Sequence, residues 1–169
     1  MRSTGAAAGS AVFFALAPGT VAGLLPWWLT RWEAGAAFGR WLPARLAGIL
    51  ILVAGTAVLV HSFARFVLEG LGTPAPIAPP AHLVVSGLYR YVRNPMYLAV
   101  TATILGQALL LWRPVLLGYA ALVTAAMVAF VLGYEQPALA QRFGSEYTTY
   151  RRAVPGWRPR LTPWRPGRR

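Results

Sequence analysis

Long apolar runs, separated by polar segments, make up most of the chain. Four of them are close to the roughly 20 residues that cross a bilayer as a helix, and they cover residues 6–29, 46–68, 95–112 and 115–134. This pattern predicts an all-α integral membrane bundle of about four transmembrane helices in a single domain, 1–169. The first run could also be a signal peptide, but it continues into "LLPWWLTRW" without a convincing cleavage site, so we interpret it as a retained span.

Two polar segments lie outside these runs. In the loop at 69–94, prolines and glycines disfavour a helix and favour an extended path along the membrane surface. The tail at 135–169 begins with a stretch that can form an amphipathic helix, with Glu135, Leu139 and Arg142 around one side. We expect these two segments to form the functional site together.

Composition and charge indicate where the chain resides. Hydrophobic residues make up 57% of the 169 residues, far more than a soluble domain of this size needs. With the N-terminus in the cytoplasm, twelve of the sixteen arginines fall on inside segments and four on outside turns, which satisfies the positive-inside bias. We therefore expect a multi-pass protein of the cell (inner) membrane, with both termini, the loop and the amphipathic helix on the cytoplasmic side.

Several kinds of chemistry are disfavoured by what the sequence lacks. Without cysteine there is no disulfide or thiolate nucleophile, and without aspartate there is no Ser-His-Asp triad. The two histidines, His61 and His82, make a poor metal site, so we expect no metal. A basic tail beside anionic membrane lipids explains the arginines more simply than nucleic acid does, so we expect lipid contacts and no nucleic acid.

The stretch "GLYRYVRNPMYLAV" has a local mechanism of its own. Asn94 followed by Pro95 is typical of a helix start, with the asparagine side chain capping an exposed backbone N–H group. The helix N-terminus, with Arg90 or Arg93 nearby, suits a carboxylate or phosphate. Three tyrosines can offer ring faces to a cation: Tyr89, Tyr91 and Tyr97. Taken alone, arginine and tyrosine also mark a membrane interface in any protein, and this alternative stays open.

Two motifs make the sequence resemble the isoprenylcysteine carboxyl methyltransferase family, within a wider group that includes phospholipid methyltransferases. The first, Gly-x-Tyr-x-x-x-Arg-His/Asn-Pro-x-Tyr, is matched by Gly87, Tyr89, Arg93, Asn94, Pro95 and Tyr97. The second, Glu-Glu-x-x-Leu-x-x-x-Phe-Gly-x-x-Tyr-x-x-Tyr, is matched by Glu135, Leu139, Phe143, Gly144, Tyr147 and Tyr150. Two departures are Asn94, which cannot titrate as the histidine of many relatives does, and Gln136, which replaces the second acid.

The resemblance implies an S-adenosylmethionine-dependent methyltransferase, with the cofactor between the loop and the tail. Its expected contacts are the residues of the first motif, Glu135 of the second, and the backbone of three loop residues, Leu83, Val84 and Val85, with Gly87 allowing close approach. Glu135 is expected to pair with the amino or ribose groups, and Arg142 to face the acceptor. These two are the candidate catalytic residues.

The acceptor remains open: it is a lipid-like or small hydrophobic molecule methylated on oxygen, nitrogen or sulfur. Two other classes also remain. A small four-helix transporter would use an ionisable residue within the membrane, for which His61 is the clear candidate. A sterol-reductase-like enzyme would use NADPH, although the chain is short for one.

Overall fold

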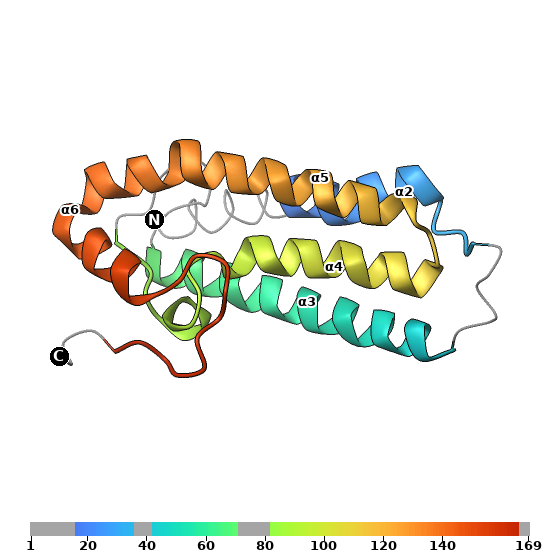
Figure 1. Ribbon diagram of the computed structural model, residues 1–169, viewed down its shortest axis with the longest axis horizontal. Coiled ribbons are helices and arrows are strands. Elements are labelled where there is room, and N and C mark those ends of the chain that lie inside the picture. The colour runs from blue at the N-terminus through green and yellow to red at the C-terminus, as the bar shows by residue number, and fades with distance from the viewer. Residues whose placement is uncertain (1–15, 36–41, 71–81, 166–169) are drawn as a thin grey trace, which may run out of the picture.

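The computed structural model describes residues 16–35, 42–70 and 82–165, and every regular element in these ranges is helical (Figure 1). This confirms the predicted all-α class. The elements are a π-helix η1 (Thr20–Leu24), α2 (Leu25–Thr30), α3 (Leu42–Gly70), a 3₁₀ turn η2 (Gly87–Arg90), α4 (Pro95–Leu111), α5 (Val115–Phe130), a π-helix η3 (Val131–Glu135) and α6 (Gln136–Ala153).

Three predicted apolar runs coincide with helices. Two helical stretches, Leu42–Arg65 and Val115–Ala153, are long and apolar enough to cross a membrane, and Pro95–Leu111 is a shorter apolar helix. Of the first predicted span, residues 16–30 are helical, and residues 1–15 lie outside the described part of the chain. The proline-rich stretch 71–81 of the predicted loop lies outside it as well.

The bundle is organised around α4, which packs between α3 and α5 (Figure 1). Helices α3 and α4 approach each other almost to backbone contact at two glycines. A Cβ atom added to Gly106 would lie 2.6 Å from the Leu52 nitrogen, and one added to Gly48 would lie 2.5 Å from the Leu110 nitrogen. Such close approach is how apolar helices gain packing energy where lipid gives no hydrophobic drive to association.

Polar side chains fasten the N-terminal helical segment to this core. The Gln107 Nε2 atom donates to the Ala22 carbonyl at 2.7 Å, and the Tyr119 hydroxyl donates to the Val21 carbonyl at 2.8 Å. Both carbonyls lie in the π-helix η1, where the wider turn departs from the regular α-helical bonding pattern. The bonds join α4 and α5 to the first helix of the described chain.

The predicted last span ends at residue 134, but the helix does not end there. Helix α5 continues through η3 into α6, so the amphipathic segment follows the apolar run without a break in the helix. It turns sharply at Gly144, whose φ of 51° and ψ of −121° lie outside the helical region. Beyond this kink α6 folds back toward the loop that contains η2 (Figure 1), and it buries Tyr147 and Tyr150 while exposing Glu146.

The opposite end of the bundle is closed by short connections. The Gly35 backbone N–H group donates to the Leu111 carbonyl at 2.8 Å. Arg113 donates through Nε to the Glu33 carbonyl at 2.8 Å, and its Nη2 atom lies 3.6 Å from the Glu33 carboxylate. These contacts join the α2 end to the α4–α5 turn.

Candidate functional site

The η2 loop is held against the end of α3. The Tyr89 side chain is buried, and its hydroxyl donates to the Ser62 carbonyl at 3.4 Å. Gly87 has a φ of 51°, and a Cβ atom there would lie 3.2 Å from His61 Nε2. Glycine therefore allows both the backbone conformation and the close approach to α3.

The N-terminus of α4 begins at Pro95, as predicted, but the predicted cap is wrong. Asn94 occupies the cap position, yet its side chain makes no capping hydrogen bond. The side chain is 7% exposed, and its Nδ2 atom has no hydrogen-bond partner in the described part of the chain. Gly156 packs beside it, since a Cβ added to Gly156 would lie 3.5 Å from Nδ2. A buried donor without a partner beside a helix N-terminus is a feature of an anion-binding site.

Arg93 connects this helix start to the end of α6. Its Nε atom donates to the Val154 carbonyl at 2.9 Å, and its Nη1 atom donates to the Tyr147 hydroxyl at 3.1 Å. Its backbone N–H group donates to the Pro155 carbonyl at 2.9 Å. Burial raises the pKa of the Tyr147 hydroxyl, although Arg93 has a lowering effect, so this tyrosine stays neutral and accepts the bond.

The central polar contact joins the two predicted motifs. The Tyr97 hydroxyl on α4 donates to the Glu135 Oε2 atom in η3 at 2.8 Å, and both side chains are half-buried. Arg93 lies near enough to Glu135 to interact electrostatically. No ion pair to Glu135 occurs within residues 16–35, 42–70 and 82–165. The carboxylate thus faces the site with a neutral hydroxyl as its hydrogen-bond donor.

The distal part of the tail, which we expected to form the site with the loop, follows a path that the sequence did not predict. After α6, residues 154–165 cross the η2 loop (Figure 1), and we call this segment the C-terminal strap. The Arg160 N–H group donates to the Tyr91 carbonyl, and Arg90 and Trp164 exchange two bonds through backbone and side chain, at 2.7–2.9 Å. Trp164 also lies 5.5 Å, centroid to centroid, from the Tyr150 ring.

The strap brings a second tryptophan to the centre of the site. Trp157 lies 6.3 Å from Tyr97 between ring centroids, with the ring planes at 38°. The preceding Gly156 lies close against Arg93, since a Cβ there would be 3.1 Å from Arg93 Nη2. The only signal in the sequence for this arrangement is the glycine before an aromatic residue in "VPGWRP", which is too short to predict a contact across sixty residues.

The other predicted site residues take different positions. Leu83 and Val85 pack against the cluster of Tyr147, Tyr150 and Val154, and Val84 is buried. Their side chains help to hold α6 to the loop. The Tyr89 carbonyl accepts a bond from the Tyr150 hydroxyl at 2.7 Å, which strengthens the same contact.

Arg142 is not brought into contact with the Tyr97–Glu135 pair. Its side chain is exposed on α6, with the guanidinium 5.9 Å from the centroid of the Phe143 ring. Its predicted role toward the acceptor therefore stays a prediction.

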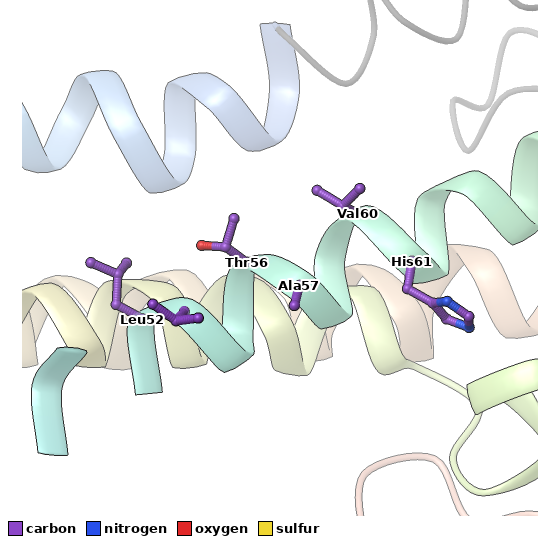
Figure 2. A pocket seen from close by; sticks show the side chains of 6 residues that line it. Leu52, Thr56, Ala57, Val60 and His61 are labelled. Atoms are coloured by element: carbon purple, nitrogen blue, oxygen red, sulfur yellow. The ribbon is translucent and has the colours of Figure 1, made fainter. Parts of the chain in front are cut away.

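His61 lies at one end of an open groove along α3, as Figure 2 shows. The groove encloses about 650 Å³ and is lined by Leu52, Val53, Thr56, Ala57, Val60 and His61. The imidazole is exposed and lies beside the η2 loop. It is thus near the polar end of the bundle, away from the middle of the span where a transporter would need it.

Comparison with known protein families gives one result. A family model described as phospholipid methyltransferase matches residues 43–146, which include the whole first motif and the second motif as far as Gly144. Comparison with curated proteins and with solved structures finds no match. The matched range begins in α3 and ends within α6, before the C-terminal strap.

Proposed function

Since the chain belongs to the phospholipid methyltransferase family, a group of membrane methyltransferases, we propose that it transfers a methyl group from S-adenosylmethionine to a lipid-like or small hydrophobic acceptor. The observation that carries this proposal is the Tyr97–Glu135 hydrogen bond, beside an α4 N-terminus where the Asn94 Nδ2 atom has no hydrogen-bond partner among the described residues. It joins the two motifs into one polar site at one end of an apolar bundle.

The residues present fit the charged groups of S-adenosylmethionine. The α4 N-terminus, Asn94 and Arg93 offer donors and positive charge to its carboxylate. Glu135 offers an acceptor to its amino or ribose hydroxyl groups. The Tyr97 ring offers a face to its sulfonium. Thus each of these charged or polar groups has a complementary partner among side chains that lie around one helix start.

The cofactor, when bound, supplies a methyl carbon whose bond to sulfur breaks, with the electron pair staying on sulfur, as a lone pair of the acceptor forms the new bond. This displacement requires no protein nucleophile, in keeping with a chain that has no cysteine and no aspartate. The residues of the site need to align the reactants and exclude water. The C-terminal strap, which covers the η2 loop, supports the second role.

The decisive experiment is titration calorimetry of the detergent-purified protein with S-adenosylmethionine and with its demethylated product, S-adenosylhomocysteine. We expect saturable binding of both ligands. If neither ligand produces a heat of binding, the proposal is wrong. A parallel titration with NADPH separates the sterol-reductase-like alternative, for which we expect no binding.

We propose that the protein crosses the membrane several times, with both termini in the cytoplasm. The end of the bundle that carries the α4 N-terminus and the strap, which we call the site end, also faces the cytoplasm, because the arginines concentrate on that side. Single cysteines introduced into this cysteine-free chain test the orientation. We expect a His82→Cys variant to react with an impermeant reagent only after the cells are opened, and a variant at Arg113 to react from outside. Labelling of position 82 in intact cells would reverse the orientation.

A further inference from the structure

Trp157 lies in the C-terminal strap, beyond the range matched by the family model. It is half-buried and faces Tyr97, whose hydroxyl is already held by Glu135. Trp157 therefore contacts a tyrosine whose hydroxyl is hydrogen-bonded to Glu135, while the ring of that tyrosine can still contact a ligand.

The side chains of Trp157, Tyr97 and Glu135 together favour the binding of a cation. Aromatic faces carry negative electrostatic potential, and tryptophan attracts cations most strongly of the three aromatic side chains. Glu135 adds a carboxylate that no arginine neutralises by a direct ion pair in the described ranges. Two rings and one carboxylate resemble the aromatic cages that bind quaternary ammonium groups. A sulfonium is a compact cation of the same kind.

We infer that Trp157 is a specificity-determining residue that, with Tyr97 and Glu135, recognises the positive charge on the sulfur of the methyl donor. The inference rests on the function proposed above and adds a consequence to it. After methyl transfer the sulfur is neutral, so the attraction to the rings is lost. The site then favours the charged donor over the neutral product, which helps the product to leave.

The same strap provides a control residue. Trp164 exchanges hydrogen bonds with Arg90 and packs against Tyr150, so its role is to hold the strap in place. A change at Trp164 should weaken both ligands alike. A change at Trp157 should weaken mainly the charged one. The comparison separates recognition of charge from support of the fold.

The test is calorimetry of Trp157→Leu, Trp157→Phe and Trp164→Leu with S-adenosylmethionine and S-adenosylhomocysteine. The measured quantity is the ratio of the two dissociation constants in each variant. For Trp157→Leu we expect S-adenosylmethionine to lose about two- to thirtyfold more affinity than the product, which corresponds to the range known for cation–π contacts. Trp157→Phe should lose a measurable part of the discrimination, because phenylalanine attracts cations more weakly than tryptophan, and Trp164→Leu should leave the ratio unchanged.

Equal losses for both ligands in Trp157→Leu would overturn the inference and make Trp157 a packing residue. If the leucine variant does not fold, a Trp157→Phe ratio identical to that of the unmodified protein overturns it, because phenylalanine has the weaker face. Failure of the unmodified protein to bind either ligand is a different result. It rejects the proposed function itself and leaves no sulfonium for Trp157 to recognise.

Discussion

The two ends of the helical bundle use the same residue types in opposite ways. At the end formed by α2 and the α4–α5 turn, Arg113 lies 3.6 Å from the Glu33 carboxylate, and the two side chains are 33% and 73% exposed. At the other end, Arg90 and Arg93 donate to main-chain carbonyls of the strap. There the carboxylate of Glu135 accepts from a tyrosine.

The two glutamates differ in the partner that each carboxyl group has, an arginine for Glu33 and a tyrosine for Glu135. Glu33 is neutralised by an arginine in contact with water, and such a pair has little capacity to bind anything else. Glu135 is half-buried and makes no ion pair within the described ranges, because the nearby Arg93 donates to the Val154 carbonyl and the Tyr147 hydroxyl instead. A carboxylate held in this way can bind a cationic or hydroxylated ligand.

The largest expected effect comes from removing the charge at the site end. We expect Glu135→Gln to lower the affinity for S-adenosylmethionine about ten- to a hundredfold, since a hydrogen bond to a charged group is worth roughly 1.5–3 kcal/mol. Glu33→Gln, the matched change at the other end, should leave the affinity unchanged. Calorimetry measures both, and equal affinities in the two variants would mean that the ends do not differ in function.

A second prediction concerns the turn that brings α6 to the site end. Gly144 has a φ of 51° with ψ of −121°, a conformation that costs a residue with a side chain about 1–3 kcal/mol. We expect Gly144→Ala to destabilise the fold by this amount, measured by thermal unfolding in detergent. Gly118→Ala is the control, because Gly118 is helical within α5 and a Cβ there meets nothing within 4 Å. Similar unfolding temperatures for both variants would contradict the role of the turn.

The smallest expected effect concerns the exposed positive charge of the site end. We expect Arg142→Ala to reduce methyl transfer about tenfold while leaving S-adenosylmethionine binding intact, because only the acceptor loses its alignment. Arg158→Ala, in the strap, should change the rate little. The measurement is the transfer rate at saturating cofactor. Equal small effects would assign Arg142 to contact with lipid phosphate.

Much of the fold could be predicted because helix length and apolar runs are local properties of the sequence. The start of α4 at Pro95 follows from proline chemistry. The Asn94 cap failed because its side chain is buried beside Gly156, from the far end of the chain. A capping rule that considers only neighbours in sequence has no access to that contact.

The sequence indicated that the loop and the tail would form the site together, but it did not predict how the strap is held. The hydrogen bond from Tyr97 to Glu135 joins one residue of each motif. The strap is held largely through main-chain groups, such as the Arg160 N–H bonded to the Tyr91 carbonyl. Main-chain hydrogen bonds require no particular residue type, so no pattern of residues in the sequence predicts them. The sequence therefore placed the tail at the site without predicting the individual contacts of the strap.

The π-helical turn at Val131–Glu135 has a consequence for comparing this chain with its relatives. A π-turn accommodates one residue more than an α-turn, and each residue of an α-helix rotates the following side chains by about 100°. A relative that lacked one residue in this stretch and kept a regular helix would present its carboxylate at the same point in space, one position earlier in sequence. Alignments without a gap here would then superimpose Glu135 on a residue that faces elsewhere.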